Sequence, residues 1–498
     1  MIVEQQRQKK LYDYQKEAIE AIFKRFNSFK HSYNLLYQLP TGGGKTVIFS
    51  EIAKRYISET NKKVLILTHR IELSKQTSKA LKEIGVSNKV INSSVKSISD
   101  ADKHMCYVAM VETLNNRLKE DQVAISNIGL VIVDEAHYNS FRKLFKYFKK
   151  CLMLGVTATP LSSNINLPMK NTYSELIVGN TISGLIEDKF LAKAETYSYN
   201  VGLGALRIGI NGDYTVKSSE TVYIDYAMQE KLITAYEERA KGKKTLIFNN
   251  GINTSRYVYD CFKKAGYDVR HLDNKHSDSE RKEIIDWFRK TPGAILSSVS
   301  ILTTGFDEPS IEAIIINRAT RSLTLYHQMI GRGSRTYKDK DTFTVVDMGN
   351  NVARFGLWEN PVNWQNIFKN PDYFLENLIT DEMIERSFSY TMPIDLRKKF
   401  SNSKDVEFDI EKSFQEIKHL GLKPKIVIER AIEQHAKICM ENSEDAYEAM
   451  ELAKLLDDSI AHRVKQYAYC ISKSTANYQE WLEQQYKRDL RSELRKMI

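Results

Sequence analysis

Ten short apolar runs, five early in the chain and five later, constrain its fold more than any other feature. The first group occupies residues 34–40, 63–69, 106–111, 130–136 and 152–159. The second group occupies residues 244–250, 267–273, 294–300, 312–318 and 342–348. Each run is rich in Val, Ile and Leu with little alternation, which is typical of strands buried on both faces of a parallel sheet. Since helical segments separate the runs, the sequence predicts two α/β domains in tandem.

The remaining sequence divides the chain around these two groups. At 498 residues the chain is too long for one core, and a typical domain size of about 150 residues suggests about three domains. We expect a first α/β domain over 1–200, a linker rich in Gly, Ser and Asn over 201–225, and a second α/β domain over 226–360. Residues 361–498 lack the strand pattern and predict a helical accessory domain, with candidate helices near 411–419, 425–440, 443–470 and 475–497.

The last of these helices carries a stripe of large apolar residues at helical spacing. The stripe consists of Tyr478, Trp481, Leu482, Tyr486, Leu490 and Leu494. Such spacing favours packing against a neighbouring helix over a stacking surface for nucleic-acid bases, because an exposed aromatic stripe needs separate support.

Charge is unevenly distributed along the chain. The net charge is +10, and residues 371–498 carry −4, which leaves +14 on residues 1–370. A basic excess favours a polyanionic partner, although many solvated surfaces are mildly basic. Five scattered cysteines without a CxxC pair indicate neither a zinc ribbon nor a disulfide framework. Without a membrane-length apolar run or a secretory signal, the sequence predicts no membrane partner and a cytoplasmic location, either nucleoid-associated or in the host cytoplasm if a phage encodes the protein.

The stretch PTGGGKT, residues 40–46, lies between a predicted buried strand and a helical segment. Backbone N–H groups of such a loop can surround a phosphate chain, and the positive end of the next helix points there. Lys45 would add a full charge, and Thr46 would hold a magnesium ion. The pattern departs from the usual P-loop at Leu39, where glycine is expected. The predicted nucleotide-binding residues of this stretch are Thr41, Gly42, Gly43, Gly44, Lys45 and Thr46.

Two acidic residues, Asp134 and Glu135, end another predicted buried strand in VIVDEAH. The carboxyl ends of strands are where an α/β sheet presents its functional loops. Phosphoryl transfer needs one carboxylate for the metal, here Asp134, and a neighbour that polarises the attacking water. An acidic pair in a solvated loop is the alternative, and the apolar strand before the pair argues against it.

Three further polar residues fit the same site. Thr157 and Thr159 end the next strand in GVTATP, where a hydroxyl could contact main chain or a carboxylate and so sense the acidic pair. A plain strand followed by a proline-stopped turn is the alternative. Gln15 lies 25 residues before the first residue of the P-loop stretch, and its amide could pair with adenine.

Taken together, these motifs resemble the superfamily 2 helicases in their DEAH-box form. The matching stretches are PTGGGKT, DEAH, TAT, GFDEP at 305–309 and QMIGRGSR at 328–335, in that order from residue 11 to about 350. VLILTHRIELSKQ, ILTTGFDEP and RSLTLYHQMIGRGSR look most like the RadD family of bacterial repair helicases and their phage relatives. Two departures limit that closer match: the RadD zinc segment is absent, and Tyr12 stands where arginine is expected.

The resemblance implies two RecA-like P-loop domains with the nucleotide held between them. Arg332 and Arg335 would then be arginine fingers that reach from the second lobe to the terminal phosphate. Gln328, with Thr157 and Thr159, would couple the site to lobe movement. Gly305 and Asp307 would contact the nucleotide, Asp307 through the ribose.

The resemblance also assigns contacts away from the phosphates. Arg70, Thr113, Thr303 and Thr304 would hold the nucleic-acid backbone without regard to sequence. Tyr12 would stack on adenine, with a core tyrosine as the equal alternative.

These inferences predict an enzyme that uses ATP and Mg²⁺ to translocate on DNA and to unwind or remodel it. The expected partners are single-stranded, forked or branched DNA, with RNA and single-strand-binding or recombination proteins as further candidates, and the chain is expected to act as a monomer. Three alternatives stay open: an RNA helicase, a nucleic-acid-binding ATPase switch, and the motor subunit of a restriction or defence complex.

Overall fold

The structure is a computed structural model, and it forms two compact units, Met1–Ile379 and Thr380–Ile498. The residues that it describes are 11–29, 32–95, 97–98, 103–120, 123, 125–299, 302–303, 305–388, 390–471 and 475–496. Among the helices of these residues, none combines the length and the apolar character that crossing a membrane requires.

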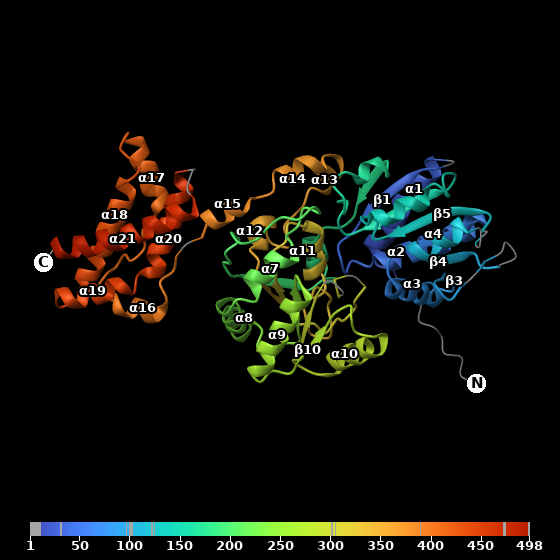
Figure 1. Cartoon of the computed structure of the whole chain (residues 1–498). Coiled ribbons are helices and arrows are strands. Elements are labelled where there is room, and N and C mark those ends of the chain that lie inside the picture. Colours follow the sequence, from blue (N-terminus) through green and yellow to red (C-terminus); the bar gives the residue numbers. More distant parts are fainter. Residues whose placement is uncertain are drawn as a thin grey trace. The chain divides into compact units, whose positions relative to one another are not determined.

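The first unit contains two parallel sheets, which confirms the predicted fold class (Figure 1). The first sheet has the order β3-β4-β2-β5-β6-β1-β7. Its strands are β1 Asn34–Gln38, β2 Lys63–Thr68, β3 Asn88–Ile91, β4 Cys106–Met110, β5 Ile128–Asp134, β6 Leu152–Thr157 and β7 Glu175–Val178. The helices of this domain are α1 Asp13–Ser28, α2 Lys45–Thr60, α3 Ile71–Glu83, α4 Val111–Lys119, α5 Arg142–Phe145 and α6 Ile182–Glu187.

The second sheet has the order β10-β11-β9-β12-β13-β8. Its strands are β8 Lys193–Ser198, β9 Thr245–Asn249, β10 Val269–Leu272, β11 Ile295–Ser298, β12 Ala313–Asn317 and β13 Thr342–Asp347. The helices that follow or flank it are α7 Val216–Tyr223, α8 Tyr226–Arg239, α9 Ile252–Lys264, α10 Asp278–Lys290, α11 Leu323–Ile330, α12 Asn351–Phe355, α13 Trp364–Lys369 and α14 Pro371–Glu376.

The structure differs from the expected boundaries in two places. Strand β8 falls within the range expected for the first domain, yet it pairs with β13 at the edge of the second sheet. Residues 361–379, expected in the C-terminal domain, belong to the first unit, because Trp364, Ile367 and Phe368 are buried in the same core as the sheets. Strands β3, β7 and β8 lie at sheet edges, where half-exposed side chains give no apolar run to recognise.

The second unit is entirely helical in its described residues. Its helices are α15 Asp381–Arg386, α16 Ile394–Lys399, α17 Ile410–His419, α18 Ile426–Glu441, α19 Ala446–Lys454, α20 Asp457–Cys470 and α21 Ala476–Lys496. Leu482, Tyr486, Leu490 and Leu494 of α21 are buried in its core, which confirms that this stripe packs against neighbouring helices. Trp481 is half exposed and stacks on Tyr478.

Candidate active site

The P-loop connects β1 to α2 and is shaped by left-handed glycines. Gly42 and Gly44 have φ angles of +88° and +84°, which a residue with a side chain adopts only at a cost. A Cβ on Gly44 would lie 2.7 Å from Nε2 of Gln15, so the glycine also allows a close approach. The Lys45 ammonium donates to the Leu39 and Pro40 carbonyls at 3.2 and 3.3 Å, within the loop itself.

The structure explains why leucine is tolerated at the first P-loop position. The Leu39 side chain is fully buried, and its Cγ lies 2.9 Å from where a Cβ on Gly43 would be. The residue therefore adds to the core beneath the loop, while the backbone path at Gly42 and Gly44 supplies the curvature.

The predicted adenine end of the site lies at the start of α1. Oε1 of Gln15 accepts from the Tyr12 amide at 3.0 Å, and Nε2 donates to the Tyr14 hydroxyl at 3.3 Å. That hydroxyl donates to the Gly43 carbonyl at 2.9 Å, so this segment is tied to the P-loop. Tyr12 is 52% exposed, which excludes the core alternative, and its ring lies 4.4 Å from that of Phe190 beside a cavity of about 630 Å³.

The acidic pair is buried at the end of β5. Asp134 is 4% exposed and Glu135 is 6% exposed. Burial, together with the Glu135 charge, raises the pKa of Asp134. Burial alone would also raise the pKa of Glu135, but Lys45, His137, His69 and Arg332 outweigh it and lower this pKa. Glu135 also has a φ of +54°, and such strain in a non-glycine residue is typical of functional sites.

Several buried polar atoms in this region have no hydrogen-bond partner in the described structure, among them the Thr41 hydroxyl and both ring nitrogens of His69. Two others are Oε2 of Glu135, an acceptor, and Nη1 of Arg335, a donor. Leaving such atoms unsatisfied costs about 1–3 kcal/mol each, so they fit a bound group that carries both a cation and anionic oxygens. A nucleotide with its magnesium ion has that chemistry, and Asp134 and Thr46 supply oxygens of the kind that Mg²⁺ prefers.

Both candidate fingers lie at the seam between the two α/β domains. The Arg332 side chain is buried and donates to the Phe306 carbonyl at 2.7 Å. Burial lowers the pKa of Arg332 to about 9, with Arg335 lowering it further and Glu135 opposing both. Arg335 forms an ion pair with Asp307, with 2.6 Å between Nε and Oδ1. Burial lowers the pKa of Lys45, and the charges of Arg332 and Arg335 lower it further, whereas Glu135 and Asp134 oppose the shift.

A chain of polar contacts leads from the acidic pair into β6. His137 places Nδ1 3.4 Å from Oε2 of Glu135 and 2.9 Å from the Thr157 hydroxyl. All three side chains are buried. Thr157 also donates to the Thr159 carbonyl at 3.1 Å, so the end of β6 is connected to the acidic pair through His137.

The same chain crosses the seam to α11 of the second domain. The Thr159 hydroxyl donates to that of Thr324 at 3.0 Å. Nε2 of Gln328 lies 3.5 Å from Nε2 of His137, at the limit of a hydrogen bond. At the end of α11, a Cβ on Gly331 would lie 2.6 Å from Cβ of Thr41, so the helix packs directly on the P-loop.

The predicted nucleic-acid contacts are only partly brought together. Arg70 and Thr303 line one cavity of about 310 Å³ together with Arg321. Thr113 lies half-buried in the first turn of α4 and does not line that cavity. Thr304 lies outside the described residues.

The contacts of Gly305, a predicted nucleotide residue, are with α3. Its φ is +78°, and its carbonyl accepts from Nε2 of Gln76 at 2.7 Å. A Cβ at this position would meet Leu73 and Glu72. Gly305 therefore joins the second domain to α3.

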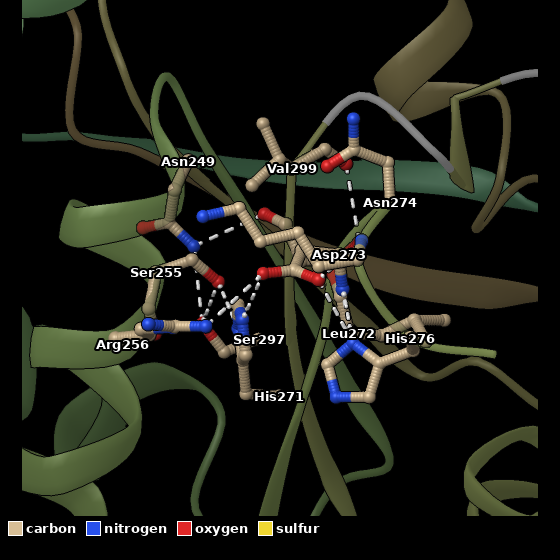
Figure 2. Close-up of polar contacts among 12 residues, drawn as sticks. Asn249, Ser255, Arg256, His271, Leu272, Asp273, Asn274, His276, Ser297 and Val299 are labelled. Atoms are coloured by element: carbon tan, nitrogen blue, oxygen red, sulfur yellow. Dashed lines mark hydrogen bonds and ion pairs between the residues drawn. The ribbon is translucent and has the colours of Figure 1, made fainter. Parts of the chain in front are cut away.

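A second buried polar cluster lies at the carboxyl ends of β9, β10 and β11 (Figure 2). Asp273 is fully buried and accepts from the Lys275 amide at 2.8 Å, with His276 and His271 at 2.9 and 3.2 Å. Burial alone would raise the pKa of Asp273, but these hydrogen bonds lower it to about 2. Ser255 lies 2.8 Å from His271, which completes a Ser-His-Asp order, but its full burial excludes it as a nucleophile. The cluster instead fixes the loop that carries Lys275.

Sequence reasoning did not assign roles to several residues that the structure places at the seam. His137 lies two residues after Glu135 in VIVDEAH, so the motif itself could have pointed to it. Thr324 and Gln76 have no such signal, because their partners are Thr159 and Gly305, which are distant in sequence.

Two family models match the two α/β domains. Residues 8–162 match the res subunit of type III restriction enzymes, and residues 226–337 match the helicase conserved C-terminal domain. The first match covers the P-loop and the acidic pair, and the second ends just beyond Arg335.

Known proteins are similar to this chain over two thirds of its length or more. A 51.5 kDa protein of a Lactococcus phage is 29% identical over 342 residues, which cover 67% of this chain and 70% of that one. The helicase-family protein IRC3 of Saccharomyces cerevisiae is 29% identical over 357 residues, or 68% of this chain, and the match spans about half (51%) of its length. In fold, the chain is similar to the ATP-dependent type ISP restriction-modification enzyme LlaBIII bound to DNA, with a TM-score of 0.54 and 16% identity over 98% of this chain and 40% of that one.

Proposed function

Since this chain belongs to the superfamily 2 helicases, whose paired domains make it an ATP-hydrolysing enzyme acting on nucleic acid, we propose that it is a DNA translocase that unwinds or remodels forked or branched DNA. In this proposal ATP binds at the seam of the two α/β domains, and its hydrolysis changes how the domains pack. The proposal covers only this chain, which matches about half of IRC3.

The observation that carries the proposal is the chain of contacts from Glu135 to α11. Glu135, His137 and Thr157 are linked within the first domain, and Thr159 contacts Thr324 of the second at 3.0 Å. A change at Glu135 can therefore bias contacts at the seam, which is what coupling of hydrolysis to domain movement requires.

We assign the reacting end of the site as follows. Lys45 and the backbone of residues 41–44 bind the phosphates. Glu135 accepts a proton from the attacking water through Oε2, which lies 3.4 Å from Nδ1 of His137 but accepts no hydrogen bond in the described structure. Its lowered pKa keeps this carboxylate ionised near neutral pH. Arg332 and Arg335 stabilise the negative charge that develops on the transferred phosphoryl group.

Thr46 and Asp134 would hold the magnesium ion, which neutralises phosphate charge when bound. Burial raises the pKa of Asp134, so the metal is expected to compete with a proton for this carboxylate. Two protein oxygens would leave the rest of the coordination of the ion to phosphate oxygens and water.

DNA is favoured over RNA as the track. The type III res subunit match and the DNA-bound LlaBIII fold support DNA, as does the likeness of VLILTHRIELSKQ to the DEAH-type RadD repair helicases. Arg70 and Thr303, at one cavity, are the proposed backbone contacts. A stable partner on co-purification would instead favour the motor subunit of a restriction complex.

The test compares ATP turnover in the presence of single-stranded DNA, duplex DNA, forked DNA and RNA. We expect stimulation by single-stranded and forked DNA, together with displacement of streptavidin from biotinylated single strands. Stimulation by RNA alone would overturn the DNA assignment, and turnover without displacement would identify an ATPase switch.

A further inference from the structure

A short hairpin at residues 207–215 precedes α7 in the first unit. The Thr215 amide donates to the Arg207 carbonyl, and the Gly209 amide donates to the Asp213 carbonyl, both at 2.8 Å. A turn closes the hairpin, with the Gly212 amide bonded to the Gly209 carbonyl at 3.0 Å and a φ of +80° at Gly212. A turn followed by a left-handed glycine is one of the common ways to close a tight hairpin.

The tip of the 207–215 hairpin is apolar. Ile210 stands at the turn and is fully exposed, and Ile208 is 54% exposed. Val216, directly after the hairpin, is 48% exposed. Single exposed apolar residues are ordinary, but three in nine residues, with a β-branched side chain where turns favour polar residues or glycine, point to a contact surface.

The turn end of the same hairpin is held to the second α/β domain through Asp213, which directly follows the turn. The Asp213 carboxylate accepts from the Thr320 hydroxyl and from the Arg321 amide, both at 2.7 Å, and pairs with the buried Arg318 at 3.4 Å. Tyr214 is buried beside it. An exposed apolar tip next to such an anchor can resist a load without folding away.

The hairpin lines the cavity that the proposed DNA contacts also line, and the residue that follows it lines a second cavity. Asn211, Gly212 and Asp213 line the cavity of about 310 Å³ that Arg70 and Thr303 also line. Val216 lines a second cavity of about 700 Å³, to which Arg70, Lys275 and Arg281 contribute. Arg70 thus borders both cavities.

We propose that the 207–215 hairpin is a strand-separating wedge, with Ile208 and Ile210 seated against the first base pair of the duplex. The inference rests on the proposed function, because it needs a strand held at Arg70. Apolar side chains placed against a base step partly unstack it, while the cationic residues beside them grip the backbone of the strand that enters. Translocation would then drive the duplex onto the hairpin tip.

The test replaces the apolar tip while leaving the turn and its anchor intact. In the double variant Ile208→Ser and Ile210→Ser, we expect unwinding of a forked duplex to fall at least tenfold. Single-stranded-DNA-stimulated ATPase and streptavidin displacement should stay within twofold. Ile210→Leu should retain unwinding, and Ile394→Ser, at an exposed isoleucine of the helical unit, is the matched control.

A binding measurement separates the wedge from a folding defect. A fork with 2-aminopurine at its first base pair should brighten when the wild-type protein binds, and the double variant should bind without the brightening. Unchanged unwinding, or parallel loss of ATPase and unwinding, would overturn the wedge. A wild-type protein without DNA-stimulated turnover would overturn the proposed function instead, so the two failures are distinguishable.

Discussion

The ion pair between Arg335 and Asp307 makes a quantitative prediction about the arginine finger. The two side chains are 23% and 55% exposed, so the pair contributes only about 0.2–1 kcal/mol. A finger that stabilises the transition state contributes far more, about 10³-fold or more in kcat, or about 4 kcal/mol. The triphosphate can therefore recruit Arg335 from Asp307 at small cost.

We expect Arg335→Ala to lower kcat by about 10³-fold and to change ATP affinity by less than about fivefold. Asp307→Ala, which breaks the pair but keeps the guanidinium, should change kcat by about fivefold at most. Steady-state ATPase with saturating single-stranded DNA gives kcat, and titration with a fluorescent ATP analogue gives affinity.

Arg239→Ala is the matched control, because Arg239 is an exposed arginine on α8 that pairs with Glu238. A kcat of Arg335→Ala within tenfold of the wild-type value would refute the finger. A loss of ATP affinity as large as the loss of kcat would refute its action in the transition state alone.

Three further predictions follow from the buried contacts. Glu135→Gln keeps the shape of the side chain but removes the carboxylate that accepts the proton, so ATP turnover should fall by about 10²–10⁴-fold while a fluorescent ATP analogue still binds. Near-normal turnover would exclude Glu135 as the general base. Thr324→Val removes the seam hydrogen bond to Thr159, and we expect lower streptavidin displacement per ATP hydrolysed than in the wild type, whereas unchanged coupling would show that this contact is not part of the path. The pKa of Asp273 is lowered to about 2 in the fold, so its ionised form stabilises the protein above its ordinary pKa near 3.8 and this stability is lost as the pH falls toward 2. Asp273→Asn should flatten the dependence of unfolding free energy on pH between about 5 and 2, measured by urea denaturation, and an unaltered profile would contradict the assignment.

The sequence by itself determined the two parallel sheets and the local shape of the phosphate site. Nine of the ten predicted apolar runs form strands that pair with a neighbour on both sides. Such strands are buried on both faces of the sheet, so nearly every residue of the run is apolar and the run can be recognised in the sequence. The exception among the predicted strands is β10, which forms one edge of the second sheet. The P-loop and the acidic pair could also be predicted, because their chemistry depends on neighbours within a few residues.

Tertiary structure alone decided how those pieces act on one another. Thr159 and Thr324 are 165 residues apart, and Arg335 meets Asp307 only because the loops carrying them fold back to the same edge. The linker expected at 201–225 contains α7 and a hairpin, and the hairpin is anchored through Asp213, whose partners lie more than a hundred residues away. Patterns of burial and turn chemistry are local, whereas these contacts depend on which surfaces the packed domains bring together, so no stretch of sequence specifies them alone.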